Sequence, residues 1–479
     1  MVHHLPPRLR PFLSTLFLYP LTAAVISLLP LLLWQWNPVF IRSTYGEAYQ
    51  PFELFGFWGA AAVLGRTLWL LWTVKPLTWP RVLPILVPAA ILLHFLGLIS
   101  EYSTPAWDYN CYQSAAAAIL AQSSPYSGCY LYPPLLAEIL AAFHTLLLKI
   151  TFISRGEADR SWAIVFYLFQ CAQFFSLALA YPLIYRFARR LGFEKTTAVL
   201  LTAALLLINN PLLRTLRHTQ VNLFVLDLFL LALLLAGRVP LLSGFSAAVG
   251  INLKLYPAVL FIPWLLTRRW RPILFALIGL ALIILLSAEW GQEWSLWEQF
   301  LSASQSFPPG TQFRDNSLHS LVFNGLGFFA GPMGMAAETF RAIVSIVVAA
   351  LSLLLAGWLG LRIFRRQQSL KTAAAPIPAS AELHYFSQAM DSLALGLLLA
   401  PRVWEHHYVL AVPIVLWGMA VAGRDRPLLV GTAAILMLTL PTFDIYPLSY
   451  HRLAGLLLML YLTSPRETSR RLDTGGIVD

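Results

Sequence analysis

Apolar runs of helix-spanning length recur from one end of this 479-residue chain to the other. An α-helix needs ~20 apolar residues to cross about 30 Å of hydrocarbon, so the shorter runs predict tilted, broken or partly inserted helices. The runs cover residues 12–34, 53–74, 83–100, 133–152, 162–186, 196–213, 221–236, 243–267, 272–288, 340–364, 386–400, 407–423, 428–444 and 452–463. This pattern predicts an all-α polytopic membrane protein, with one integral membrane domain over 1–479.

Composition excludes the soluble alternatives. Apolar residues make up 58% of the chain and charged residues 11%, whereas soluble domains average about 25% charged residues. A soluble enzyme, a secreted repeat protein and a disordered scaffold are therefore all poor interpretations. The run 12–34 is longer than the apolar region of a signal peptide and lacks a small-residue cleavage site, so we expect an uncleaved first transmembrane helix there.

Basic residues indicate the orientation of the chain. The net charge of +11 comes from short clusters between apolar runs, which is typical of cytoplasmic loops rather than of a nucleic-acid-binding surface. The cluster that begins at Arg362 predicts a cytoplasmic loop over 365–385. The polar segments 101–131, 289–318 and 401–406 then share the outer face.

The middle of the chain allows two topologies. If every run crosses once, there are 14 transmembrane helices, but the basic cluster around Arg189 then lies outside. If 133–152 enters without crossing and 240–267 is a broken hairpin, there are about 12. That version leaves Lys149 and Arg160 outside, but it places residues 220–222 and Lys254 on the outer face, and we favour it.

Asp108 is the first candidate for chemistry. It lies in the outer loop 101–131, between Trp107 and Tyr109. A carboxylate there can accept the proton of a sugar hydroxyl as a general base. It can equally be an ordinary loop residue, or the N-cap of a helix over the Ala-rich stretch 113–122.

Cysteine usage leaves one open question. Three cysteines are too few for a disulfide framework or a zinc site. Cys111 and Cys129 share the outer loop and can pair if that loop faces an oxidising compartment.

Lys254 is the second candidate, because an ionisable side chain between apolar runs is expensive. Pro257 can break the helix and bring Lys254 to a water-filled cavity, where its charge would complement a phosphate. The alternative is a lysine that snorkels to the interface. Gln220 and Asn222 open an apolar run, where they can bind sugar hydroxyls or simply join neighbouring helices.

The remaining candidates lie in the other outer loops. His406 and His407 can bind a phosphate or stabilise a leaving group, or they can belong to an interfacial belt. Adjacent positions point to different sides of a helix, so at most one of the pair faces a given pocket. Asn316 belongs to a dense set of hydrogen-bonding residues in the loop 289–318, which can equally be a solvated loop. A phosphate-binding glycine loop is missing, which disfavours a cytoplasmic nucleotide-sugar enzyme and an ATP-driven pump.

Together these motifs resemble glycosyltransferase family 87, the polyprenyl-phosphate-mannose-dependent mannosyltransferases of the GT-C class. The matching segments, in family order, are Asp108-Tyr-Asn-Cys-Tyr-Gln-Ser-Ala, Ser-Pro-Tyr126, Tyr132-Pro-Pro-Leu, Gln220-Val-Asn222-Leu, Gly250-Ile-Asn-Leu-Lys254-Leu-Tyr-Pro257, Asn316-Ser-Leu and Pro401-Arg-Val-Trp-Glu405-His406-His407. The chain departs from the family at Ala121-Gln-Ser-Ser, where glycine is usual, and at Thr219, where the family often has glycine before the Gln.

The resemblance implies a GT-C-type fold with the catalytic loop on the outer face. It implies Asp108 as the general base, Lys254 and the pair His406/His407 as donor-phosphate residues, and Tyr132, Gln220, Asn222 and Asn316 as further substrate-binding residues. The location implied is a bacterial inner membrane, with the active site on the periplasmic side.

We therefore expect an inverting transfer of a hexose from a polyprenyl-phosphate carrier to a glycan or glycolipid acceptor. Mannose is the hexose that we expect. The expected partners are membrane lipid and the lipid-linked donor, with no nucleic acid, cofactor or metal. Two alternatives stay open: a lipid or anionic-solute transporter, and a polymer ligase that uses a lipid-pyrophosphate donor.

Overall fold

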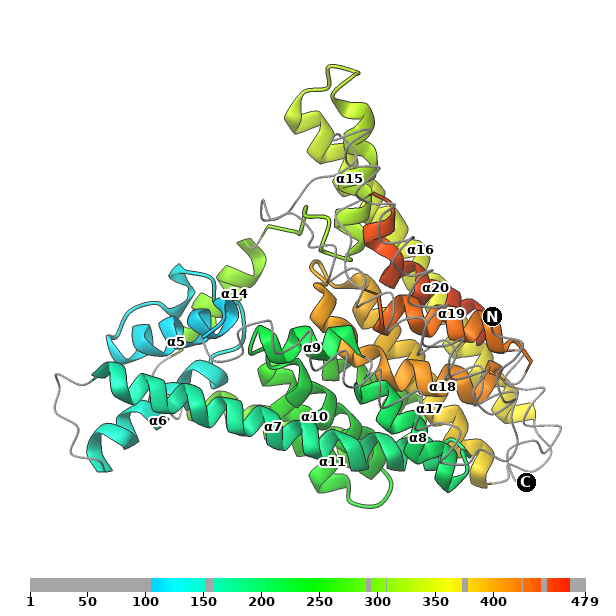
Figure 1. Cartoon of the computed structure of the whole chain (residues 1–479), viewed down its shortest axis with the longest axis horizontal. Helices are drawn as coiled ribbons and strands as arrows, with labels where there is room; N and C mark the ends of the chain where they lie inside the picture. Colours follow the sequence, from blue (N-terminus) through cyan, green and yellow to red (C-terminus); the bar gives the residue numbers. More distant parts are fainter. Residues whose placement is uncertain are drawn as a thin grey trace, which may run out of the picture. The chain divides into compact units, whose positions relative to one another are not determined.

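The computed structural model describes residues 105–150, 158–207, 209–289, 294–306, 308–372, 378–423, 425–440 and 446–465. The runs expected at 12–34, 53–74 and 83–100 lie outside these residues. Within the described part, the chain is helical and contains no β-strand, only one isolated antiparallel bridge between Asp315 and Trp404 (Figure 1). The predicted all-α class is therefore confirmed for this part of the chain.

The described residues form two compact units. The Asp108 unit comprises residues 101–183 and 214–308, and the C-terminal unit comprises 184–213 and the chain from 309 onward. The helices α7 (Ala158–Arg190) and α9 (Asn210–Arg217) each contribute to both units.

The Asp108 unit combines short helices with longer apolar ones. Its elements are α5 (Trp107–Leu120), η4 (Pro125–Ser127), α6 (Leu135–Ile150), the first part of α7, the end of α9, α10 (Asn222–Leu235), α11 (Pro240–Leu253), η6 (Tyr256–Leu260), α12 (Phe261–Leu266), α13 (Trp270–Ser287) and α14 (Ser295–Ser306). Helices α11 and α13 pack closely because a glycine of α11 faces the backbone of α13 where the two helices meet. A Cβ on Gly244 would lie 2.6 Å from the Ala276 nitrogen. Small residues permit such close approach between apolar helices in membranes.

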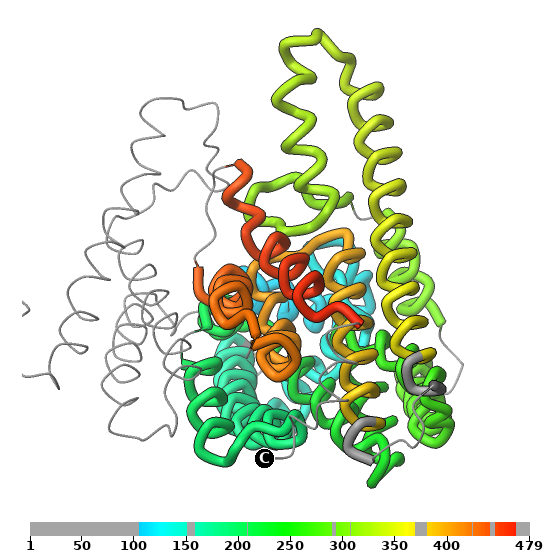
Figure 2. Tube along the Cα trace, turned by 90° about the vertical axis from the view of Figure 1, so that its right-hand side faces the viewer, coloured from blue at the N-terminus to red at the C-terminus, as the bar shows by residue number. Residues whose placement is uncertain are grey.

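The C-terminal unit holds the remaining helices. They are the end of α7, α8 (Lys195–Leu207), the start of α9, α15 (Leu318–Ala330), α16 (Ala337–Thr372), α17 (Pro378–Leu399), η8 (Glu405–Ala411), α18 (Val412–Ala422), α19 (Pro427–Leu438), η9 (Leu448–Tyr450) and α20 (His451–Leu462). Figure 2 shows α15 and α16 as neighbouring helices of a hairpin. Along α16, Ile346, Leu353 and Leu354 are exposed, as expected for a helix that faces lipid.

Four described helical segments are long and apolar enough to cross a membrane, by length and composition: Asp159–Arg190, Trp270–Ser287, Ala337–Gln368 and Glu405–Ala422. The bent pair α8 and α9 would make a fifth, and α10, α11, α15 and α19 are among several shorter apolar helices. These segments support a membrane protein. The total of 12 to 14 crossings stays a prediction.

The segments expected to be loops are more helical than the sequence suggested. Helix α14 lies inside the loop expected at 289–318. In the loop expected at 365–385, α16 continues to Thr372 and α17 begins at Pro378. Arginine, glutamine and lysine are good helix formers, which accounts for the continued helix. The cytoplasmic location of this segment stays a prediction.

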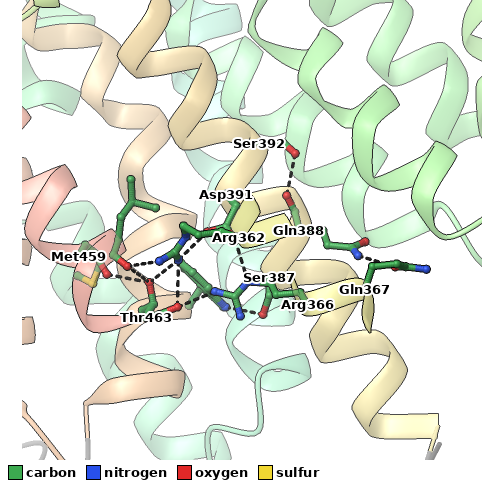
Figure 3. A network of polar contacts seen from close by, with 11 residues as sticks. Arg362, Arg366, Gln367, Ser387, Gln388, Asp391, Ser392, Met459 and Thr463 are labelled. Atoms are coloured by element: carbon green, nitrogen blue, oxygen red, sulfur yellow. Dashed lines mark hydrogen bonds and ion pairs between the residues drawn. The ribbon is translucent and has the colours of Figure 1, made fainter. Parts of the chain in front are cut away.

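Two arginines of that basic cluster are buried rather than solvated (Figure 3). Arg362 and Arg366 lie one turn apart on α16, and both donate to the Asp391 carboxylate of α17, at 2.9 and 2.8 Å. Both also donate to the backbone oxygen of Thr463, beyond the last turn of α20. One carboxylate and the carbonyl end of a helix thus share two positive charges, an arrangement that the helix dipole favours.

Candidate functional site

Asp108 lies in the first turn of α5. The N-cap of this helix is Ala106, whose side chain makes no capping bond, so Asp108 is not the N-cap that the sequence allowed. The helix covers most of the Ala-rich stretch, which confirms the helical prediction there. A disulfide joins Cys111 on α5 to Cys129, with a Cα–Cα distance of 5.4 Å, and ties the segment after α5 back to the helix.

Gln220 lies beside Asp108 and is almost completely buried. Its Oε1 accepts hydrogen bonds from two tyrosine hydroxyls, Tyr112 at 3.0 Å and Tyr132 at 3.2 Å. Its side chain also acts as a hydrogen-bond donor toward the Asp108 carboxyl, which lowers the pKa of that carboxyl. The backbone oxygen of Gln220 accepts a 2.9 Å bond from Nε2 of Gln173 on α7.

Lys254 completes the same group. Helix α11 ends at Leu253, and Lys254 has extended backbone dihedrals before η6 begins, so the predicted break at this residue is confirmed. The Lys254 Nζ donates to Asn222 Oδ1 at 2.8 Å and lies 5.5 Å from the centre of the Tyr132 ring. Its positive charge also acts on Asp108.

The structure therefore brings together several residues that are far apart in sequence. We call them the Asp108 cluster, whose members are Asp108, Tyr112, Tyr132, Gln220, Asn222 and Lys254. All belong to the Asp108 unit. Tyr112 is the member that sequence reasoning did not select. Its only signal was its place in the motif, one helical turn after Asp108.

The local electrostatics suit Asp108 to accept a proton. Burial raises the pKa of its carboxyl to about 6, while the hydrogen bond from Gln220 and the charge of Lys254 work in the opposite direction. The carboxylate is therefore mostly ionised at neutral pH, with a pKa close to the operating pH. That combination is the most effective one for general-base catalysis.

Asn316, His406 and His407 belong to the C-terminal unit, where all three are buried. The Asn316 backbone N–H donates to the Val403 oxygen at 2.8 Å, and the His406 and His407 rings meet edge to face at 4.8 Å. The structure thus joins the Asn316 loop to the segment that leads into the histidine pair.

Asp315, which belongs to the same set of hydrogen-bonding residues in the segment 289–318, makes this junction. Its Oδ1 accepts the backbone N–H groups of Val403, at 2.8 Å, and Ser317, at 2.9 Å. Gly310 also approaches it so closely that a Cβ there would overlap the carboxyl oxygen. No local pattern signals this pairing, because the two segments are 88 residues apart.

At both places where the chain departs from the family pattern, a residue has a left-handed backbone conformation. Gln122 has φ 54°, just after α5, and Thr219 has φ 53°, just before Gln220. Glycine adopts this region readily, whereas other residues incur about 1–2 kcal/mol there. The glycine preference of the family at these places therefore has a conformational reason.

We expect Thr219→Gly to raise the free energy of unfolding by about 1 kcal/mol, because it removes a left-handed β-branched residue. Thermal unfolding in detergent measures the change. Thr202→Gly, in the middle of α8, is the matched control and should destabilise by about 1 kcal/mol. A Thr219→Gly variant that destabilises as much as the control would contradict the strain argument.

Within the described ranges, no group of three or more His, Cys, Asp or Glu side chains is placed to hold a metal ion. No curated protein and no solved structure shows a significant match to the chain. The sequence model of glycosyltransferase family 87 matches residues 130–380, more than half of the chain, and this region includes Tyr132, Gln220, Asn222 and Lys254. The chain therefore belongs to glycosyltransferase family 87 and is a membrane glycosyltransferase.

Proposed function

We propose that this glycosyltransferase moves a hexose, mannose in the first instance, from a polyprenyl-phosphate carrier to an acceptor hydroxyl, with inversion at the anomeric carbon. The observation that carries the proposal is the Asp108 cluster itself. It places a carboxylate that can accept a proton beside a cation that can stabilise a phosphate. Family membership favours this transferase over a transporter.

The proposed reaction is a single displacement. The acceptor oxygen attacks the anomeric carbon and gives its proton to Asp108. The bond from the anomeric carbon to the phosphate oxygen breaks, and the polyprenyl phosphate leaves with the electron pair. Attack opposite the leaving group inverts the configuration. Negative charge develops on the departing phosphate, so a fixed cation near it stabilises the transition state more than the ground state.

Lys254 is the proposed partner of that phosphate. Asn222 Oδ1 and the Tyr132 ring hold its ammonium group at the cluster. His406, His407 and Asn316, which belong to the C-terminal unit, are proposed as further substrate-binding residues. The backbone bond between Asn316 and Val403 supports a shared role for the Asn316 loop and the histidine pair.

The disulfide supports an active site on the outer face. Cys111 lies on α5, one turn after Asp108, and pairs with Cys129. Disulfides persist in oxidising compartments such as the periplasm and are rare in the cytosol. An alkylating reagent that labels both cysteines without prior reduction in intact cells would oppose this orientation.

A reconstituted assay tests the proposed function directly. Purified protein in liposomes receives polyprenyl-phosphate [¹⁴C]mannose and a panel of glycolipid acceptors, and labelled products are separated by chromatography. We expect label to move to an acceptor, with the anomeric configuration inverted. Transfer only from a polyprenyl-pyrophosphate sugar, or no transfer from any lipid-linked sugar, would overturn the proposal.

Lys254→Met should chiefly weaken donor use, because it removes the charge and keeps an unbranched chain. We expect kcat/KM for the donor to fall about 10- to 100-fold, as for the loss of a charge-assisted contact of 1.5–3 kcal/mol. Lys149→Met is the matched control, since Lys149 lies in the last turn of α6. An unchanged KM and kcat in Lys254→Met would exclude Lys254 from the phosphate site.

A further inference from the structure

The amide of Gln220 has two chemically different ends. Its Oε1 accepts from the hydroxyls of Tyr112 and Tyr132, and a carbonyl oxygen has two lone pairs to offer. The side-chain bond to Asp108 then falls to Nε2, a donor. The two tyrosines thus determine which end of Gln220 faces Asp108.

The opposite orientation of the amide is unfavourable. It would turn Oε1 toward the Asp108 carboxylate, so that two acceptors would face each other unless the carboxyl were protonated. It would also direct Nε2 at two hydroxyls, which would then have to accept rather than donate. Donation from Nε2 therefore goes with an ionised Asp108, the form that a general base requires.

The backbone of Gln220 is fixed as well. Its N–H donates to the Thr215 oxygen at 2.9 Å, and its carbonyl accepts from Gln173 at 2.9 Å. The residue is 1% exposed. With both lone pairs of Oε1 occupied and one N–H on Asp108, the amide has a single N–H left for a substrate.

We propose that Gln220 is a positioning residue that acts through Asp108, with Tyr112 and Tyr132 as the hydroxyls that hold its amide, rather than a sugar-binding residue. The inference rests on the proposed function in one respect, namely that Asp108 is the general base. It assigns a task to Tyr112 and changes the tasks expected for Gln220 and Tyr132.

Two readouts test the inference, and one of them does not require transfer. A carbodiimide reacts with a protonated carboxyl, so the pH dependence of labelling at Asp108, measured by peptide mass spectrometry, reports its ionisation. The second readout is the pH dependence of kcat/KM in the reconstituted assay. The variants are Gln220→Met and the double substitution Tyr112→Phe with Tyr132→Phe.

Tyr130→Phe is the matched control. Its ring contacts the Tyr132 ring at a tilted angle, but its hydroxyl donates to the Pro133 oxygen and accepts from the Ala137 N–H instead of contacting Gln220. Any general loosening of the aromatic rings should appear in this variant too.

We expect half-maximal labelling of Asp108 to move up by about one pH unit in both test variants, because the ionised carboxyl loses its donor. The acid limb of kcat/KM should move with it. With each profile normalised to its own plateau, kcat/KM at pH 6 should be about fivefold lower in the variants than in the wild type, and at pH 8 the two should differ little. The Tyr130→Phe control should keep the wild-type profile in both readouts.

An unmoved labelling profile in Gln220→Met, with Asp108 labelled in the wild type, would overturn the inference whatever the enzyme transfers. A raised donor KM with an unmoved acid limb would also overturn it, in favour of direct sugar binding. If labelling shifts as expected but no lipid-linked sugar is used, the positioning of Asp108 stands and the proposed function fails.

Discussion

Replacing Asp108 with asparagine is expected to lower transfer by roughly 10²–10⁴-fold, the usual contribution of a general base. Asparagine keeps the size of the side chain and can still bond Gln220 after an amide rotation. It cannot take the proton of the acceptor hydroxyl. We therefore expect kcat to fall while the donor still binds, as measured by equilibrium binding of labelled polyprenyl-phosphate mannose to the reconstituted protein.

The control for this prediction is Asp159→Asn. Asp159 is an exposed carboxylate in the first turn of α7, within the same unit. It should retain full activity. An Asp108→Asn enzyme with more than about a tenth of wild-type kcat would remove Asp108 from the role of base.

The pH profile provides a second check on the same residue. A base must be ionised to act, and burial raises the pKa of Asp108 to about 6, with Gln220 and Lys254 opposing the rise. Wild-type kcat/KM should therefore fall tenfold per pH unit well below pH 6. A profile that stays flat down to pH 4.5 would show that no group with this pKa acts as the base.

Replacing Asp391 with alanine is expected to destabilise the protein strongly, by about 3–5 kcal/mol. It would leave the guanidinium groups of Arg362 and Arg366 buried without a counter-charge (Figure 3). All three side chains are at most 5% exposed, so water cannot replace the lost carboxylate. Thermal unfolding in detergent should show a large fall in Tm or loss of the folded protein.

The matched control breaks an exposed ion pair of the same unit. Arg190 Nη1 contacts Glu382 Oε1 at 2.7 Å, but both side chains are partly exposed. Glu382→Gln should therefore change stability by no more than about 1 kcal/mol. Equal losses in the two variants would show that burial does not decide the cost.

A triple variant with Arg362→Met, Arg366→Met and Asp391→Leu distinguishes two contributions to stability. One is the pairing of the buried charges, and the other is the hydrogen bonds from the arginines to carbonyl oxygens at the end of α20. Removing a whole buried charge group is often neutral or stabilising. Here the arginines also donate to the carbonyl oxygens of Leu460 and Thr463 at the end of α20. We therefore expect only partial recovery of Tm relative to Asp391→Ala. Full recovery would mean that these carbonyl bonds contribute nothing.

The helical class and the helix break at Lys254 could be predicted from the sequence. Apolar runs and Pro257 are local signals, and the backbone responds to them locally. The limits of the loops were less predictable. Residues 365–372 are polar yet helical, because helix propensity and the pairing of Arg366 with Asp391 outweigh the charge pattern.

The site residues divide in the same way. Asp108, Gln220 and Lys254 could be selected because polar residues beside apolar runs are costly and few. Tyr112 could not, since a tyrosine on a short helix in an aromatic loop carries no such signal. The partner of Asp315 could not be predicted either, because Val403 is reached only through tertiary folding.

The sequence by itself determined that this chain is helical and membrane-bound, and it supplied a short set of candidates for chemistry. Hydrophobicity and helix breaks are properties of neighbouring residues, so a linear pattern carries them. Only the tertiary structure decided that Oε1 of Gln220 accepts from two tyrosine hydroxyls, because these hydroxyls lie 88 and 108 residues away along the chain. It also placed Arg362 and Arg366, two members of the basic cluster, in a buried charge network with Asp391. Hydrogen bonds act over about 3 Å in space, whatever the separation along the chain.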